Sequence, residues 1–420
     1  MKISLFQGIL FGVFGLAALV GLFVFATYSG KNTGTAAVGA VVIWGTLPAD
    51  AMEKVLQSAT AADPTLKGVV YIQKSPTTLP ADLASAIATG AAPDLILASQ
   101  ENIYTLAKFI TPIPSSTLSA STFTNAFPDG ASIFTAPGGY YGIPFLIDPL
   151  VLFANRSILS SSGIARPPAT WEALTGLVPS VTTLTSSRQV TRGLIALGTY
   201  SNVHNARGIL STLFFQTGVP ISSYSANSGL SASLGASSSG GQRPGPAVLG
   251  FYTQFTDPSK ASYTWNVSLR DSQQAFIAGD LALYLGYASE ARFFSSANPN
   301  LNFAVTPVPQ PATASVKSAY GLIYAFMIPR GAKNSSGAYQ AAALLTNQVA
   351  QEAAASYTGL APAALTELAN TPADPVAAVA YAEALYTKGW LSPAPADTDR
   401  IFSGMITDVI TGRFTLDAAL

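Results

Sequence analysis

The sequence contains no cysteine and only one histidine, His204, among its 420 residues. Without cysteine, the chain has no disulfide, no thiol nucleophile, no zinc–thiolate site and no iron–sulfur cluster. A single histidine leaves little material for a catalytic triad, and the sequence has no HExxH, Walker or Gly-x-Ser-x-Gly motif. We therefore expect a protein that is not an enzyme and that uses no metal or cofactor.

Charged residues are also scarce, at 10% of the chain, and Lys+Arg and Asp+Glu both number 21. This balance provides no basic surface for nucleic acid. Hydrophobic residues make up 49% of the chain, which is enough for extensive cores. Because 420 residues exceed the size at which one core stops growing, we expect two lobes.

The N-terminal segment carries a long hydrophobic run with no charged residue from Ile3 to Gly30. Its most apolar part, 9–28, provides about 20 residues, or roughly 30 Å of helix, which matches a bilayer. Lys2 precedes the run and favours a cytoplasmic N-terminus with the body outside. We expect 1–30 to be a single-pass transmembrane anchor or signal segment, a cleaved signal peptide being the alternative, and 31–39 to be a linker. The predicted location is the cell membrane, with the body on the extracytoplasmic side.

Strand and helix patterns alternate after this segment, which predicts a parallel sheet covered by helices. The expected strands are 40–46, 69–72, 94–98, 150–153 and 281–285, and the expected helices are 48–59, 81–89, 273–278, 338–355 and 376–386. Thr170 is a good N-cap for a helix beginning at Trp171. The Ser/Gly-rich stretch 222–247 is expected to be a loose insertion or long loop.

The segment 139–174 combines a Tyr-Gly-Ile-Pro turn, an apolar run and a Pro-Pro stop, which indicates a chain changing direction. We expect the chain to cross from one lobe to the other here, with Asp148-Pro149 as the hinge pivot. On this prediction, Pro144 and Pro149 lie between two domains and not inside one.

Six motifs occur in an order known from one protein family. They are Val42-Ile43-Trp44, Gly90-Ala-Ala-Pro93-Asp94, Tyr141-Gly142-Ile143-Pro144 with Asn155, Pro168-Ala-Thr-Trp171, Ala275-Phe276 through Gly286-Tyr287, and Val308-Pro309 with Gly321-Leu322. This pattern resembles the extracellular solute-binding proteins of ABC importers, specifically the sugar-binding group that includes maltodextrin-binding proteins. The usual lipid-bearing cysteine of that family is missing.

The resemblance implies a two-lobed α/β periplasmic-binding-protein fold, type II-like, with a hinge and a preceding N-terminal transmembrane helix. Lobe 1 is then expected at 40–146 plus 288–335, and lobe 2 at 147–287 plus 336–420. The implied function is capture of a small solute, a sugar or oligosaccharide, by hinge closure and its delivery to an ABC permease. A non-transport surface interaction protein that reuses the fold, or an exported glycoside hydrolase with two carboxylates roughly 5–9.5 Å apart, are the alternatives.

Sugar binding requires flat aromatic faces for the apolar side of a ring and polar groups for its hydroxyls. The aromatic candidates are Trp44, Tyr141, Trp265, Tyr287, Tyr320, Tyr324 and Trp390, and the polar candidates are Thr46, Ser99, Gln100, Glu101, Asp148 and Glu290. Tyr287 is the strongest candidate, because it occupies the Gly-aromatic position where relatives place a stacking ring. A blocked cleft would favour the surface interaction protein, and an open aromatic-lined cleft would count against it.

Overall fold

The computed structural model describes residues 38–225, 229–237 and 241–420. The predicted membrane anchor, residues 1–30, lies outside these ranges. Within them, no helix is long and apolar enough to cross a membrane.

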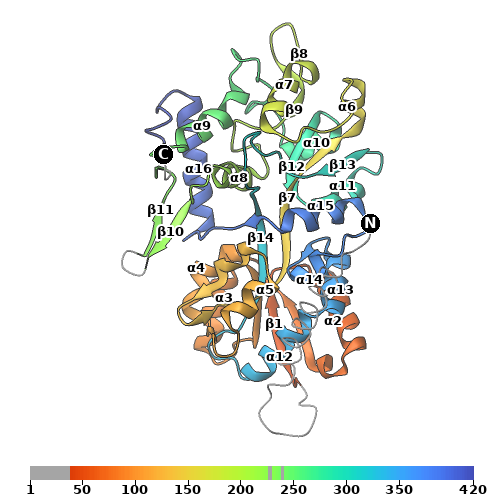
Figure 1. Ribbon diagram of the computed structural model, residues 1–420, viewed down its shortest axis with the longest axis vertical. Coiled ribbons are helices and arrows are strands. Elements are labelled where there is room, and N and C mark those ends of the chain that lie inside the picture. Colours follow the sequence, from red (N-terminus) through yellow and green to blue (C-terminus); the bar gives the residue numbers. More distant parts are fainter. Residues whose placement is uncertain (1–37, 226–228, 238–240) are drawn as a thin grey trace, which may run out of the picture.

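Within the described residues, one 11-stranded sheet runs through both lobes (Figure 1). Eight of its strands follow the order β2-β1-β3-β14-β7-β12-β9-β8, and three short ones pair beside this path, β13 and β15 with β7 and β16 with β14. In the first lobe, the parallel strands β1 (Val41–Gly45), β2 (Val69–Gln73) and β3 (Leu95–Ser99) are rich in Val, Ile and Leu, and all five residues of β3 are buried. In the second lobe, β12 (Leu281–Tyr287) pairs in parallel with β9 (Val190–Ile195). The parallel strands of each lobe direct their carboxyl ends toward a common edge, where open α/β sheets hold ligands.

The first lobe is completed by helices and short strands on either side of its sheet. These are α2 (Ala49–Ala62), α3 (Leu79–Ala88), α4 (Ile103–Leu106), β4 (Ile113–Pro114), α5 (Ala120–Ala126), the 3-10 segment η4 (Asp129–Phe134), β5 (Thr135–Ala136), β6 (Gly139–Tyr140), α12 (Ser335–Leu345), α13 (Gln348–Thr358), β15 (Ala361–Pro362) and α14 (Leu365–Leu368). Helix α13 packs against α2, and α12 packs against β1.

The second lobe has its own helices and a protruding hairpin. Its elements are α6 (Arg156–Ser161), α7 (Trp171–Val181), β8 (Thr183–Leu184), α8 (Ala206–Gln216), the hairpin β10 (Ser222–Ser225) and β11 (Gly229–Ala232), α9 (Gly245–Thr253), α10 (Ser272–Ala278), α11 (Glu290–Ala297), β13 (Phe303–Thr306), α15 (Pro375–Ala384) and α16 (Pro395–Ile410). The Ser/Gly-rich stretch expected to be a loop thus contains a two-stranded hairpin in its described part.

Strand β7 (Ile143–Asn155) is the first crossing between the lobes, and all 13 of its residues are buried. Its first half pairs with β14 (Ala319–Met327), up to Pro149 opposite Gly321, and its second half pairs with β12 from Leu150 onward. The change of partner therefore falls at Pro149, whereas Pro144 lies within the sheet of the first lobe, opposite Ala325. Of the two prolines expected between the domains, only Pro149 lies at the junction.

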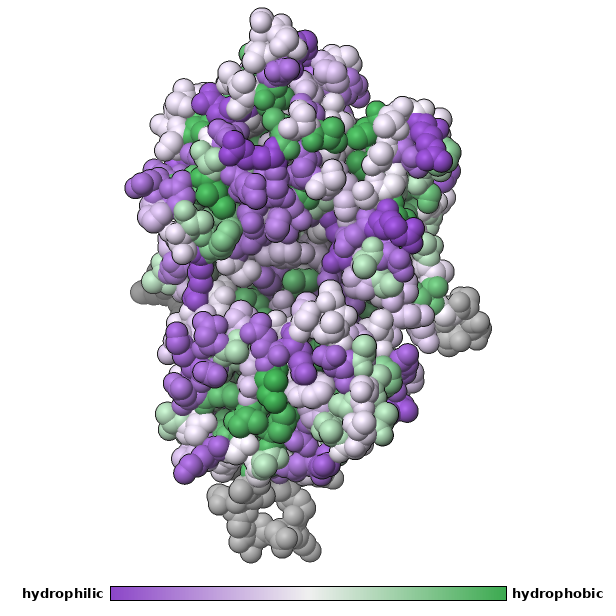
Figure 2. All heavy atoms as spheres, turned by 180° about the vertical axis from the view of Figure 1, so that it is seen from behind, coloured by the Kyte–Doolittle hydropathy of each residue, from purple (hydrophilic) through white to green (hydrophobic). Residues whose placement is uncertain are grey.

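The division between the lobes differs from the expected one in two segments. Residues 288–318, expected in lobe 1, lie with lobe 2, because β13 pairs with the distal half of β7 and α11 packs on β12. Residues 336–368, expected in lobe 2, lie with lobe 1 through the packing of α12, α13 and α14. The cause is that β14 carries the chain back to lobe 1, and a third crossing through α15 and β16 (Thr387–Lys388) returns it to lobe 2. Seen from behind, the surface is hollowed in a band between the lobes (Figure 2).

Candidate functional site

The two lobes are bridged by an ion pair, and we call the space around this pair, between the lobes, the cleft. Glu101 lies in the 3-10 turn Gln100–Asn102 that follows β3 in the first lobe, and Arg207 lies in the first turn of α8 in the second. The Arg207 Nη2 atom lies 2.8 Å from Glu101 Oε1 and 2.9 Å from Oε2, and each side chain is 19% exposed. A cation in the first turn of a helix opposes the helix dipole, so Arg207 depends on nearby carboxylates for its stability.

Further polar groups extend this bridge into a network. Asp399 on α16 lies 3.4 Å from Arg207 Nη1 and accepts a 2.5 Å hydrogen bond from the Tyr200 hydroxyl. The Tyr320 hydroxyl on β14 donates to Glu101 Oε1 at 2.5 Å. Burial opposes the charge of Arg207, yet its pKa lies above the ordinary value because Glu101, Tyr320 and Asp399 favour the cation. We call Glu101, Arg207, Asp399, Tyr200 and Tyr320 the bridging network.

Tyr287 at the end of β12 lies beside this network. A Cβ added to Gly208 on α8 would lie 3.2 Å from the Tyr287 hydroxyl and 3.2 Å from Tyr320 Cδ1, so glycine allows both rings to approach the helix. The pKa of Tyr287 is raised well above its usual value by burial and by the charge of Glu101. Tyr287 is partly exposed, which leaves part of its ring accessible.

Asp148, the predicted hinge residue, is buried on β7 at the junction of the lobes. Its carboxylate accepts hydrogen bonds from the Ser289 backbone N–H at 3.1 Å and from the Ser289 hydroxyl at 2.6 Å. Burial raises the pKa of Asp148 to about 7, and the two bonds from Ser289 only partly oppose this effect. Asp148 therefore ties β7 to the loop that follows β12.

Glu290 serves as a structural acceptor at the start of α11. It accepts hydrogen bonds from the side chains of Asn205, Gln273 and Tyr284 and from the backbone N–H of Tyr287. Four donors leave this carboxylate poorly placed for acid–base chemistry, which disfavours the hydrolase alternative in which Glu290 pairs with Asp148. Its effect is to fix the loop that carries Tyr287.

Two candidates at the end of β3, Ser99 and Gln100, are buried. Gln100 is fully buried, donates to Gly321 O at 2.9 Å and accepts from Ile323 N at 2.6 Å, so it fastens this loop to β14. Ser99 is buried opposite Tyr324. Burial raises the pKa of Tyr324, and the charges of Asp148 and Glu101 raise it further, which places Tyr324 in the same electrostatic neighbourhood.

Three other candidates, Trp44, Thr46 and Tyr141, lie in the first lobe and make their contacts outside the bridging network. Trp44 on β1 is half-buried beneath Lys74, whose Nζ lies 4.0 Å from the ring centroid. Thr46 follows β1, and its backbone N–H donates to Leu97 O at 3.0 Å. Tyr141 is held by a 2.7 Å backbone hydrogen bond to Phe134 O. Their roles as ligand contacts stay predictions.

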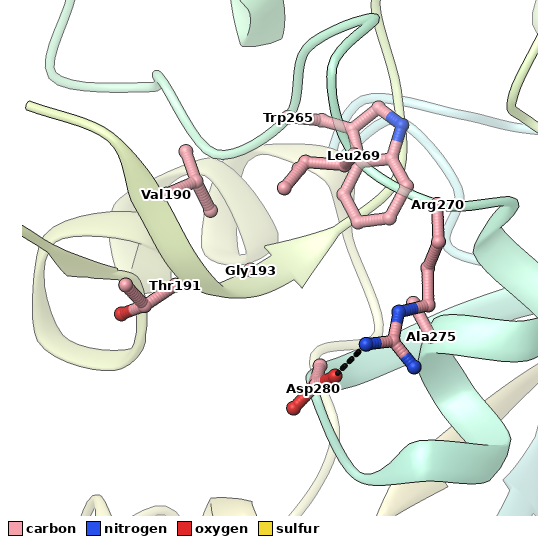
Figure 3. A pocket seen from close by; sticks show the side chains of 8 residues that line it. All are labelled: Val190, Thr191, Gly193, Trp265, Leu269, Arg270, Ala275 and Asp280. Carbon is pink, nitrogen blue, oxygen red and sulfur yellow. Dashed lines mark ion pairs between the residues drawn. The ribbon is translucent and has the colours of Figure 1, made fainter.

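Two tryptophan candidates lie outside the network. Trp265 is 1% exposed and lines a small pocket of about 130 Å³ within the second lobe, together with Val190, Leu269 and the Arg270–Asp280 ion pair (Figure 3). Trp390 is buried, and its Nε1 donates to Ser211 Oγ on α8 at 2.9 Å. Both are packed aromatics, the usual position of large rings.

Arg207, Asp399 and Tyr200 were not among the sequence candidates, although they form much of the network. Arg207 and Asp399 are separated from Glu101 by 106 and 298 positions, and none of the three lies in a motif. The sequence offered one indication of Tyr200 and Arg207: they follow strand β9, whose carboxyl end lies at the edge of the sheet where open α/β folds bind ligands. As a whole, the cleft offers aromatic rings together with a carboxylate and a guanidinium, which are hydrogen-bonding groups suited to hydroxyls.

Comparisons with known proteins agree with this architecture. A cyclo/maltodextrin-binding protein in complex with maltotetraose superimposes with a TM-score of 0.70 at 14% identity, covering 92% of this chain and 96% of that one. The GacH receptor of Streptomyces glaucescens gives 0.66 at 15% identity, with 91% and 95% covered, and the Thermus thermophilus maltotriose binding protein gives 0.64 at 16%, with 90% and 96% covered. No curated protein sequence matches the chain. The family model for bacterial extracellular solute-binding proteins matches residues 56–383, and the chain therefore belongs to that family of two-lobed binding proteins.

Proposed function

We propose that the protein captures a small uncharged sugar or oligosaccharide in the cleft between its lobes and delivers it, by hinge closure, to an ABC permease. The observation that carries this proposal is the position of Tyr287 beside Glu101 and Arg207 at the junction of the two lobes. A ring of this kind stacks on the apolar face of a sugar, and the charged pair donates to and accepts from its hydroxyls. Several neighbours in fold were solved with maltotetraose, maltotriose or acarbose, which supports the sugar class.

The direct test is a thermal-shift and calorimetric panel of neutral mono- and oligosaccharides on the full-length protein. A ligand present at 100 times its Kd stabilises the folded state by about 2.7 kcal/mol. A saccharide that stabilises the wild type but not Tyr287→Ala would support the proposal. Binding of peptides or polyamines, with no response to any carbohydrate, would exclude the sugar class.

The proposal includes a membrane location for the protein. The uncharged run Ile3–Gly30 is long enough to anchor the body on the extracytoplasmic side. Fractionation of cells that express either the full chain or a chain lacking residues 1–37 tests this: only the full chain should be found with the membrane. Recovery of both in the soluble fraction would contradict the anchor.

A second candidate function, a surface interaction protein without transport, is favoured by one observation. The Glu101–Arg207 pair bridges the cleft with the protein's own side chains, at the place where a solute would bind. If the protein has this second function, no saccharide binds the wild type, and breaking the bridge does not create binding. The saccharide panel on the wild type and on Glu101→Gln therefore separates the two functions.

A further inference from the structure

A second cavity, of about 420 Å³, lies between the hairpin β10–β11, the segment η4 and the third crossing. Both lobes and the crossing contribute to its walls. The residues that carry the argument are Asp129 and Ile133 from the first lobe, Phe215 and Tyr224 from the second, and Lys388 and Trp390 from the crossing.

None of the five residues of the bridging network lines this cavity. Helix α8 reaches from one site to the other: Arg207 lies in the cleft and Phe215 in the cavity, eight residues or about 12 Å further along the axis. The Tyr320 ring stands between them, since its hydroxyl bonds to Glu101 while its ring stacks on Phe215 with centroids 6.4 Å apart.

The aromatic walls are held in fixed positions. The indole N–H of Trp390 is bonded to Ser211 and its ring stacks on Phe402, so the orientation of the ring is set from behind. Ser222 Oγ on β10 donates to Leu391 O at 2.8 Å, which attaches the base of the hairpin to the crossing. Tyr224 on the same strand lines the cavity and is 64% exposed, so its ring is accessible from solvent.

The polar groups gather at the exposed rim, and the charges of Asp129 and Lys388 have opposite signs. An apolar interior with a balanced polar rim suits a neutral molecule that has a flat apolar face and a hydroxyl-bearing edge. The volume falls within the range of about 300–1,000 Å³ that is typical of small-molecule sites. We propose that this cavity is a second ligand site, for a small neutral ring of that chemistry, either a single sugar or a hydroxylated aromatic.

This proposal does not depend on the function proposed for the cleft, and the experiment separates the two. D-glucose and phenol are titrated, by calorimetry and tryptophan fluorescence at millimolar concentration, into full-length wild type and four variants. Tyr224→Ala removes the rim ring, Ser132→Trp fills the cavity, Tyr287→Ala alters only the cleft, and Tyr104→Ala removes an exposed ring elsewhere in the first lobe.

We expect at least one probe to bind the wild type, and to bind about tenfold more weakly, or not at all, in Tyr224→Ala and Ser132→Trp. Binding should be unchanged in Tyr104→Ala. A probe that occupies this cavity should still bind Tyr287→Ala, because that substitution weakens only the saccharide binding proposed for the cleft. Binding of glucose alone, of phenol alone or of both shows whether the site accepts a sugar, a hydroxylated aromatic or either one. Each of these results supports the site. Failure of both probes to bind the wild type, or equal binding by Tyr224→Ala and Ser132→Trp, overturns the proposal. Loss of binding in Tyr287→Ala alone also overturns it, because that result assigns the probe to the cleft.

Discussion

Because Glu101 and Arg207 bridge the two lobes, we expect a fraction of the molecules to be closed in the absence of solute. Arg207→Met should open the molecule more than Glu101→Gln does. With Arg207 removed, the Glu101 carboxylate keeps only the Tyr320 hydroxyl, whereas with Glu101 neutralised, Arg207 keeps Asp399 within its own lobe. The two single variants therefore differ in the partners that each leaves behind.

The expected magnitude follows from the geometry of the pair. Breaking a fully buried ion pair by removing one partner costs about 3–5 kcal/mol. Because each side chain here is 19% exposed, solvent screening reduces that value, and we expect about 2 kcal/mol for Arg207→Met. At 1.4 kcal/mol per factor of ten, the ratio of closed to open molecules should fall roughly 30-fold.

The absence of native cysteine makes this measurable by fluorescence transfer. Dyes on Lys67→Cys in the first lobe and Ser160→Cys in the second report the distance between lobes in single molecules without solute. Arg270→Met is the matched control, since it breaks an exposed ion pair that lies within the second lobe. The reasoning is refuted if Arg207→Met leaves the distance distribution as in the control, or if a double-mutant cycle gives a coupling below about 0.5 kcal/mol.

Three further predictions concern stability and binding. Gln100→Ala should lower the free energy of unfolding by about 2–4 kcal/mol, because it leaves two buried backbone groups of β14 unpaired; chemical denaturation measures this, and a loss below about 0.5 kcal/mol would contradict it. Burial raises the pKa of Glu383 to about 8, so the folded state keeps a proton that the unfolded state has lost. The free energy of unfolding should therefore fall as pH rises from about 4.5 to 8, by up to about 1.4 kcal/mol per pH unit, and Glu383→Gln should flatten that slope; equal slopes in both proteins would contradict it. Tyr287→Ala should weaken saccharide binding at least about tenfold in calorimetry, while Tyr104→Ala, an exposed ring in the first lobe, should not.

Elements whose boundaries depend on local chemistry were predictable from the sequence. Thr170 caps α7 through a 3.2 Å bond from Ala173 N, as expected, and α10 ends where the expected helix 273–278 ends, at Gly279 with a φ of 83°. The predicted helix 338–355 is instead two helices, because Asn347 accepts a bond from Ala350 N and starts a new one. That signal was present in the sequence, but the continuous alanine pattern on both sides concealed it.

Features that depend on distant partners could not be predicted in the same way. The strand expected at 150–153 lies in the second half of the longer β7, which is extended because β14 pairs with it before Leu150 and β12 from Leu150 onward. The lobe division was wrong in two segments because hydrophobic patterns identify helices but not the sheet on which they pack. Similarly, Glu101 was a candidate for its position after β3, yet only the folded chain brings Arg207 to it.

The bridging network also bears on which solutes the cleft can accept. A ligand that enters between Glu101 and Arg207 must replace what each gives the other, since either charge left buried and unpaired costs several kcal/mol. A sugar hydroxyl can donate to the carboxylate while another accepts from the guanidinium, so that neither charge is left without a partner. An anionic ligand would satisfy Arg207 and repel Glu101, and a cationic ligand would do the reverse. We therefore expect the ion pair that bridges the lobes to favour neutral, hydroxyl-bearing solutes if the cleft has the function proposed for it.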